Sequence, residues 1–557
     1  MRPEKQLDAA PKISAAAAQD LDRARGLARI GRSAAAEELY RDVLSREPGC
    51  VQAAAALARL LTASGRAAQA EAIITPFVQA ERVWPEALSA RAAALKQMGR
   101  KAESLADYVD AARLNPKSAV AAHNVASGLG DAGRDREAVA EAERAFSLGL
   151  DAPETWLVYG RALQGLRRFD DAEHAFRHAV ARRASYADAI RDLGQLIWMR
   201  TGDVALAIQP IDAALSAATG QPGVVAALSA VKIRLLSHIA GDQTALDFAE
   251  QALAQAPGDP RLMLDTAQLL LSQAPERSHA LIGQVLERRP ADPSARRALS
   301  HAELALGHPG KGAEIAERLL DENPRDQEAA AALATAWRLA GDNRYRRLWD
   351  YQALVRASPI DTPRGWANLD AYLADLRVAL SELHALNAHP IEQSVRGGTQ
   401  TSQNLLQSEH PVVRAFFEAV EGPICAYRDA VGQGSDIFRA RNHGAHRVHG
   451  AWSVRLRPNG FHVDHIHPEG WISSACYIDV PPAVQDQGDH AGWIRFGAPP
   501  IPTRPSLSAE HFVRPEPGLL VLFPSYLWHG TVPFGGDQVR TTIAFDLVPD
   551  EDVAVSR

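Results

Sequence analysis

A short motif repeats at a constant spacing along the first part of the chain. The dipeptide Gly-Arg stands at Gly31-Arg32, Gly65-Arg66, Gly99-Arg100 and Gly133-Arg134, each 34 residues after the last, and Arg167-Arg168 occupies the next position. A bulky aromatic residue follows eight or nine positions later in several units, as at Tyr40, Tyr108 and Phe176. A period of this length is typical of stacked helical units, so the chain is predicted to fold into a helical repeat array.

Each repeat is predicted to be a pair of short antiparallel helices. The Gly of the motif lets the first helix end in a left-handed conformation, and Pro48 and Pro116 fall where the second helix of a unit would stop. Small residues such as Ala92, Ala126 and Gly160 allow neighbouring helices to approach closely. Because one unit cannot bury its apolar face alone, stacking against its neighbours must supply the core.

The extent of the predicted array follows from where the period holds. It drifts after Gly202, but Gly307 and Gly341 are again 34 residues apart. We therefore expect an array over residues 18–345, with irregular units over residues 205–295. Its function is expected to be the binding of a protein or peptide on a concave surface, while a spacer or a dimerisation element is the alternative.

Composition and charge exclude several classes of function. The 60 Lys and Arg residues against 67 Asp and Glu give a net charge of -7, which does not favour nucleic acid as a partner. The three cysteines, Cys50, Cys425 and Cys476, are too few and too scattered for a disulfide framework. No apolar run approaches the roughly 20 residues of a membrane helix, and the N-terminal segment does not resemble a signal peptide. We expect a soluble cytoplasmic protein without a membrane partner.

The Ala-rich helical pattern of the sequence gives way to another pattern after about residue 350. An amphipathic helix is predicted over 365–388, a polar loop over 393–404 and a further helix over 411–430. Short β-like segments bounded by Pro and Gly then follow, at 452–457, 461–465, 471–480, 492–496, 519–523, 529–533 and 539–548. This number of strands in so short a segment is typical of a sandwich or jelly roll. The predicted organisation is a flexible N-terminus (1–17), the array (18–345), a helical connector (346–388), a double-stranded β-helix or jelly-roll domain (389–549) and a tail (550–557).

Histidines cluster in the first predicted strands of this domain. Residues i and i+2 of a strand face the same side, so two overlapping pairs could each bind one metal ion: His462 with Asp464, or His465 with His467. His529, on a later strand, is the expected third ligand. Three ligands on one face leave open positions on the metal, as non-haem iron oxygenases require, whereas a structural zinc site closes its coordination shell.

A basic residue follows the third histidine on the next predicted strand, where it could bind an anion. Arg540 stands eleven residues after His529, on the next predicted strand, with Thr542 on the same face of that strand. A buried guanidinium can hold one end of a dicarboxylate through two hydrogen bonds, and the hydroxyl of Thr542 can add another.

These motifs together resemble known families. The array resembles the tetratricopeptide repeat family, with Trp156, Gly160, Ala172, Phe176 and Ala179 at its large and small positions. Residues 386–549 resemble the Fe(II)- and 2-oxoglutarate-dependent oxygenases, most closely the bacterial ones that carry such repeats. The motifs that carry this resemblance are Arg396-Gly-Gly-Thr-Gln-Thr, His465-Ile-His-Pro-Glu-Gly-Trp, Gly492-Trp-Ile-Arg-Phe-Gly, Trp528-His-Gly-Thr and Arg540-Thr-Thr-Ile-Ala-Phe-Asp.

The resemblance implies a site and an activity. His529 would be the distal iron ligand and Arg540 the anchor of 2-oxoglutarate. His465 and His467 would be the proximal ligands, because the closest relatives share a His-x-His-Pro element; the general pattern of the superfamily would instead select His462 and Asp464. The residues expected to line the mouth of the barrel near the cosubstrate are Tyr477, Trp452 and Arg455. The implied activity is hydroxylation with Fe(II), 2-oxoglutarate and O2.

Two other classes of function stay open at this level. A cupin-like metalloenzyme of another kind would use the same histidines without Arg540. A protein-interaction scaffold could instead carry an inactive β-domain behind its repeats. Formation of succinate would separate the oxygenase from both.

Overall fold

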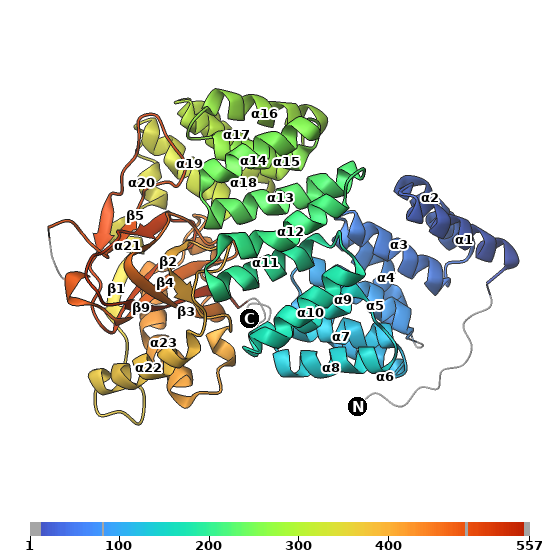
Figure 1. Cartoon of the computed structure of the whole chain (residues 1–557), viewed down its shortest axis with the longest axis horizontal. Coiled ribbons are helices and arrows are strands. Elements are labelled where there is room, and N and C mark those ends of the chain that lie inside the picture. The colour runs from blue at the N-terminus through green and yellow to red at the C-terminus, as the bar shows by residue number, and fades with distance from the viewer. Residues whose placement is uncertain (1–12, 81–82, 485–487, 551–557) are drawn as a thin grey trace. The chain divides into compact units, whose positions relative to one another are not determined.

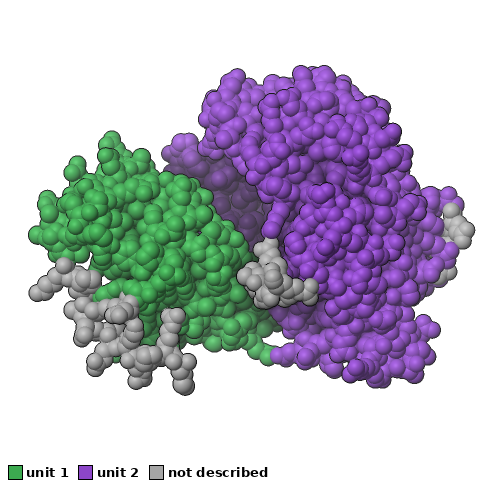
Figure 2. Space-filling view, turned by 180° about the vertical axis from the view of Figure 1, so that it is seen from behind, with its two compact units in different colours: residues 1–183 green, residues 184–557 purple. Residues whose placement is uncertain are grey.

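The computed structural model describes residues 13–80, 83–484 and 488–550. These form two compact units, residues 1–183 and residues 184–557, which are coloured separately in Figure 2. The expected N-terminal segment and tail therefore lie largely outside the described residues, and the first helix begins at Ala15. The boundary between the units falls inside the helical array.

The first unit is built from paired antiparallel helices, as the 34-residue period predicts (Figure 1). Its helices are α1 (Ala15–Arg29), α2 (Ser33–Arg46), α3 (Val51–Ala63), α4 (Ala67–Gln79), α5 (Pro85–Gln97), α6 (Lys101–Leu114), α7 (Ala119–Asp131), α8 (Asp135–Ser147), α9 (Pro153–Gly165) and α10 (Phe169–Arg182). The Gly of each Gly-Arg dipeptide has a positive φ between 69° and 78°, and Arg167 adopts the same conformation where the motif lacks its glycine. The dipeptide therefore marks the turn inside each helix pair.

Small residues set the helix spacing, as the sequence indicates. A Cβ on Gly160 of α9 would lie 2.6 Å from a ring carbon of Phe176 of α10. Phe176 is fully buried, so this pair is in direct contact at the centre of its unit. A large and a small position of the repeat thus pack directly against each other in this helix pair.

The second unit continues the array before the β-domain begins. Its repeat helices are α11 (Ala187–Thr201), α12 (Val204–Ala217), α13 (Pro222–Ile239), α14 (Asp242–Gln255), α15 (Pro260–Leu270), α16 (Pro275–Arg288), α17 (Pro293–Ala305), α18 (Pro309–Glu322) and α19 (Gln327–Leu339). The helices of residues 205–295 pair as regularly as the others, so the predicted irregularity lies in the sequence period and not in the helix pairing. By length and composition alone, α13 could also cross a membrane; here it packs against α11, α12, α14 and α15.

The connector between array and β-domain is not wholly helical. After two single-turn helices, α20 (Tyr345–Leu348) and α21 (Tyr351–Leu354), the strand β1 (Arg356–Pro359) pairs with β7 at the edge of the main sheet. The helix α22 (Leu369–Leu383) follows as expected, and α23 (Pro411–Val431) matches the last predicted helix.

Two antiparallel sheets make up the β-domain, consistent with the predicted jelly roll. The strands are β2 (Val395–Gln400), β3 (His446–His462), β4 (Ile472–Asp479), β5 (Ile494–Phe496), β6 (His511–Val513), β7 (Leu519–Pro524), β8 (His529–Thr531) and β9 (Arg540–Pro549). The main sheet has the order β1-β7-β4-β9-β3-β2, and the smaller sheet has the order β6-β5-β8. Helices α22 and α23 pack together and contact β4, β7 and β1 of the main sheet (Figure 1).

Three strand predictions need correction. Residues 395–400, expected in a polar loop, form β2, because backbone pairing with β3 does not depend on apolar side chains. The two strands expected at 452–457 and 461–465 are one strand, β3, and the Pro-Asn-Gly segment lies opposite a register shift in β2 between Arg396 and Gly398. The short strand β6 was not predicted.

Alternation along β9 separates the core from the site. Ile543, Phe545 and Leu547 are buried in the hydrophobic core, where the ring of Phe545 lies 6.1 Å from that of Phe416 of α23. Arg540, Thr542, Ala544 and Asp546, at the intervening positions, line a cavity on the other face. The period of two in a strand thus directs one set of residues toward the helices and the other toward the site.

Candidate metal centre

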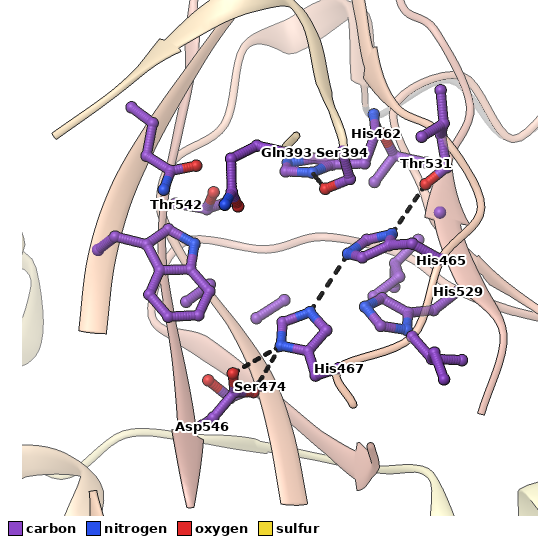
Figure 3. Close-up of a pocket in the computed structure, with 18 of the residues that line it drawn as sticks. Gln393, Ser394, His462, His465, His467, Ser474, His529, Thr531, Thr542 and Asp546 are labelled. Carbon is purple, nitrogen blue, oxygen red and sulfur yellow. Dashed lines mark hydrogen bonds and ion pairs between the residues drawn. The ribbon is translucent and has the colours of Figure 1, made fainter. Parts of the chain in front are cut away.

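A cavity of about 610 Å³ is lined by residues of both sheets. Figure 3 shows the side chains that converge on it, with His465, His467 and His529 close together. One ring nitrogen from each of these three lies within 4.8 Å of those of the other two. Among the described residues, this is the one group of histidine, cysteine or carboxylate side chains close enough to hold a metal ion.

Backbone hydrogen bonds fix the three histidines relative to one another. His465 follows the end of β3 and forms an isolated bridge with His529 of β8, whose two N–H···O distances are 2.9 Å and 3.0 Å. The backbone N–H of His467 donates to the carbonyl of Ser525 at 2.9 Å. The proximal pair is therefore held by the loop and strand around His529, and not by a regular strand as the sequence predicted.

The hydrogen bonds of the rings also fix their tautomers. Nδ1 of His465 lies 2.8 Å from the carbonyl of Val463, and Nδ1 of His529 lies 2.9 Å from the carbonyl of Leu527. A carbonyl can only accept, so each Nδ1 must carry the proton. The same holds for His467, whose Nδ1 lies 2.7 Å from the Asp546 carboxylate. Nε2 of all three rings is thus left as a lone-pair donor, and the Nε2 atoms of His465 and His467 are 3.2 Å apart.

Burial disfavours the charged form of two of these rings, His465 and His529. It lowers the pKa of His465 to about 3, helped by the neighbouring His467, and it holds the pKa of His529 well below its usual value. A neutral imidazole is the form that binds a metal ion. The chemistry and tautomers of this donor set therefore fit a divalent transition metal.

The alternative proximal pair does not join this cluster. The Asp464 carboxylate accepts two hydrogen bonds from Arg495 of β5, at 3.0 Å and 2.6 Å. Nδ1 of His462 lies 2.8 Å from the hydroxyl of Ser394, although its ring lines the same cavity. The structure thus gives Asp464 a partner of its own and leaves the cluster with histidines alone.

Arg540 lies deep in the same cavity without a carboxylate partner. Its side chain is 1 % exposed, its guanidinium lies over the rings of Tyr477 and Phe534, and one of its NH2 groups donates to the carbonyl of Gly492. Its Nε and the hydroxyl of Tyr477 are buried and have no hydrogen-bond partner. No acidic side chain of the described segments forms an ion pair with Arg540. A buried cation next to hydrogen-bond donors that have no acceptor is an arrangement suited to binding an anion.

The other residues predicted near the cosubstrate divide into two groups. Thr542, Tyr477 and Trp452 line the cavity with Arg540. Arg455 does not line it, because it stands three positions after Trp452 on β3 and so faces the opposite side of the main sheet, paired with Thr399 and Thr541. The placement of Arg455 gives no support to its predicted role.

Several lining residues were missed from the sequence. Asp546 belongs to the Arg540-Thr-Thr-Ile-Ala-Phe-Asp motif, and its position on the face shared with Arg540 and Thr542 was a signal that could have found it. Arg396 lies in the predicted loop over 393–404, and a loop prediction does not indicate that its side chain lines the cavity. His238 on the repeat helix α13 also lines the cavity, and no sequence pattern indicates that contact.

Comparison with known proteins agrees with this division of the chain. Residues 450–546 match the family model described as "Putative 2OG-Fe(II) oxygenase", and residues 15–94 and 157–222 match models of the tetratricopeptide repeat. No curated protein matches the chain.

Three solved structures are similar to parts of this chain. MamA protein is 20% identical and matches 31% of this chain and 93% of its own, with a TM-score of 0.25. A thermophilic TPR protein of Thermus thermophilus is 20% identical over 32% of this chain and 98% of its own, with a TM-score of 0.29. Yeast Tom70 is 12% identical over 61% of this chain and 91% of its own, with a TM-score of 0.34. The family models show that this chain carries tetratricopeptide repeats in its N-terminal part and a domain of the 2OG-Fe(II) oxygenase type at its C-terminus.

Proposed function

We propose that this protein is an Fe(II)- and 2-oxoglutarate-dependent dioxygenase that hydroxylates a protein, peptide or other substrate recruited through its repeats, and that it acts in the cytoplasm. The observation that carries the proposal is one cavity that contains both a three-histidine cluster and a buried arginine without a counter-ion. The match to an oxygenase family selects Fe(II) among the metals that three imidazoles bind.

In this proposal, one group of residues binds the metal and another binds the cosubstrate. His465, His467 and His529 would hold Fe(II), and Arg540 with Thr542 and Tyr477 would hold the far carboxylate of 2-oxoglutarate. When bound, Fe(II), 2-oxoglutarate and O2 supply the oxidising chemistry that hydroxylates a C–H bond. Arg540 then orients the cosubstrate through a charge-assisted pair, which is strong because the guanidinium is shielded from water.

Charge balance in the site supports this arrangement. Three imidazole ligands would add no negative charge to the metal, and the Asp546 carboxylate lies next to the site through its hydrogen bond with His467. The dianionic cosubstrate adds two more negative charges, one of which would face Arg540. An anion at this position gives partners to donors that are otherwise buried alone.

The test is anaerobic reconstitution of the full chain with Fe(II) and 2-oxoglutarate. A metal-to-ligand charge-transfer band in the visible, followed by succinate when O2 is admitted, is the expected result. A metal-binding protein that forms no band and no succinate would be a cupin-like enzyme of another kind. A folded chain that binds neither metal nor 2-oxoglutarate would be a repeat scaffold.

A further inference from the structure

One wall of the cavity comes from the repeat array. The segment after α22 lies against α11: the backbone N–H groups of Asn387 and Ala388 donate to the carbonyl of Met199 at 2.7 Å and 3.0 Å. The indole N–H of Trp198 donates to the carbonyl of His389 at 2.9 Å. This segment continues into Gln393, Ser394 and Arg396, which line the cavity together with His238 of α13. A repeat helix is therefore part of the wall that surrounds the candidate metal centre.

Arg396 is held in this wall by neutral groups. One NH2 of its guanidinium donates to the carbonyls of Gln393 and Val395, at 2.7 Å and 2.9 Å. The other lies 3.2 Å from Nδ1 of His238. Burial and the nearby Arg396 lower the pKa of His238 to about 4, so the ring is neutral and can accept this hydrogen bond. The guanidinium is thus fixed in position without being neutralised.

The acidic side chains around Arg396 have other partners. Glu392 lies 3.5 Å from Arg234 of α13, and the Asp242 carboxylate accepts a hydrogen bond from Ser237 at 2.6 Å. Across the described chain, no carboxylate forms an ion pair with Arg396, and its Nε–H has no acceptor. This half-buried cation has a donor edge available to a ligand in the cavity.

Arg396 and Arg540 are different anchors in one cavity. Arg540 is fully buried on β9, whereas Arg396 is half-buried on β2, the strand at the edge of the main sheet. His462 is close to both guanidinium groups. Burial is the main cause of the lowered pKa of its ring, and the charges of Arg540 and Arg396 lower that pKa further. With 2-oxoglutarate assigned to Arg540, the second cation has no role in the proposed function so far.

We infer that Arg396, positioned by His238 of the repeat array, binds a carboxylate of the substrate. This inference rests on the proposed function and narrows its substrate to carboxylate-bearing molecules. A monoanion fits this site better than a doubly charged phosphate, because Glu392, Glu469 and Asp546 also line the cavity. The carboxylate can belong to an acidic side chain of a polypeptide or to a small free acid.

The experiment measures binding of small probes to the full chain, loaded with Zn(II) and saturated with 2-oxoglutarate so that no turnover occurs. The probes are N-acetyl-aspartate N-methylamide, its neutral asparagine isostere, and propionate as a free acid. Saturation-transfer NMR gives the dissociation constants. The aspartate probe is expected to bind about tenfold more tightly than the asparagine probe, which is the usual value of one charge-assisted hydrogen bond.

Two variants locate the effect. Arg396→Gln is expected to remove the preference for aspartate while 2-oxoglutarate binds with unchanged affinity, and Arg377→Gln is the control, because it removes an arginine of α22 that does not line the cavity. His238→Gln provides a second variant should Arg396→Gln not fold, and it should weaken the preference. Propionate that matches the aspartate probe would assign the site to small free acids.

The result that overturns the inference is equal binding of the two capped probes to the wild-type chain, absence of binding by both, or a preference that survives Arg396→Gln. Failure of the proposed function gives a different pattern. A chain that does not bind 2-oxoglutarate, but still prefers aspartate through Arg396, would keep the carboxylate site and discard the oxygenase.

Discussion

Nδ1 of His467 donates a hydrogen bond to the carboxylate of Asp546 at 2.7 Å (Figure 3). The same carboxylate accepts a second hydrogen bond from Ser473 at 2.8 Å, and Ser473 lies 2.9 Å from the hydroxyl of Ser525. Asp546 of β9 thus connects one candidate metal ligand to a buried polar network with Ser473 of β4 and Ser525, the residue after β7. The network holds the ring so that Nε2 faces the cluster.

Asp546→Asn should weaken metal binding without unfolding the domain. An amide can occupy the same space, but it cannot supply the negative charge that makes His467 a better donor. Loss of such an outer-shell partner typically costs about 10- to 100-fold in metal affinity. Titration with Co(II), followed by its visible absorption, measures the change, and Asp479→Asn on the same sheet is the control. Unchanged affinity would show that Asp546 only fills space.

Alanine at His465, His467 or His529 should abolish metal binding. The same substitution at His462 should leave the metal content near that of the wild-type chain, since its ring is hydrogen-bonded to Ser394 and lies outside the cluster. Elemental analysis of the reconstituted proteins gives the result. Asp464→Ala should also retain the metal, but it should lower the free energy of unfolding by about 1–3 kcal/mol, because Arg495 loses its buried partner. Loss of metal in Asp464→Ala would restore the carboxylate as a ligand.

Arg540→Gln should impair 2-oxoglutarate binding and spare metal binding. Removal of one member of a buried charge pair costs about 2–5 kcal/mol, which corresponds to at least about 30-fold in the dissociation constant. Anaerobic titration of the charge-transfer band measures it. Arg455→Gln is a matched control, because this arginine lies on the same sheet but does not line the cavity. Equal weakening in both variants would point to a general charge effect.

Gly530→Ala should destabilise the fold. A Cβ at this position would lie 2.5 Å from the carboxylate of Asp464 and 3.0 Å from the carbonyl of His462. Overpacking of this kind costs about 1–3 kcal/mol, measured by chemical denaturation. Gly535→Ala is the matched control, since a Cβ there meets no atom within 4 Å. The argument fails if the two variants are equally stable.

Stability should fall as the pH is lowered from about 6.5 toward 4. Burial, and then the charge of Arg396, lower the pKa of His238 and of His389 from 6.5 to about 4. In this window the unfolded chain takes up protons that the folded chain does not, so acid favours unfolding; above the unfolded pKa both states are neutral and the contribution is constant. Thermal melts at pH 7, 6 and 5 should show a smaller loss in His389→Gln than in the wild-type chain, with the exposed His443 replaced as control. Parallel losses in all three proteins would contradict the assignment.

Local patterns predicted much of this molecule correctly. The 34-residue period correctly predicted the turns at Gly31 and Gly65. Each turn needs a residue with a positive φ, and glycine adopts that conformation without steric cost. The alternation in the last strand placed Arg540 and Thr542 on one face, and the structure has them on the cavity side. Both are short-range properties, which a sequence carries directly.

The choice between the two proximal pairs could not be made from spacing. His462 with Asp464 and His465 with His467 both have the i, i+2 spacing, so strand geometry alone treats them alike. The chain leaves the regular strand at His462, and the environment of each later side chain then depends on distant segments. Arg495 forms an ion pair with Asp464. The backbone of His465 is hydrogen-bonded to His529, and that of His467 is hydrogen-bonded to Ser525.

Patterns along the sequence specify the helical repeat, the β-domain and the types of residue that could bind a metal ion and a carboxylate. Only folding shows which histidines meet, that Asp546 is hydrogen-bonded to one of them and that Arg396 shares the cavity with a repeat helix. Periodicity reflects interactions between neighbours along the chain, so a sequence carries it directly. Donor, acceptor and counter-ion pairings instead join residues that only folding brings together, such as His238 and Arg396.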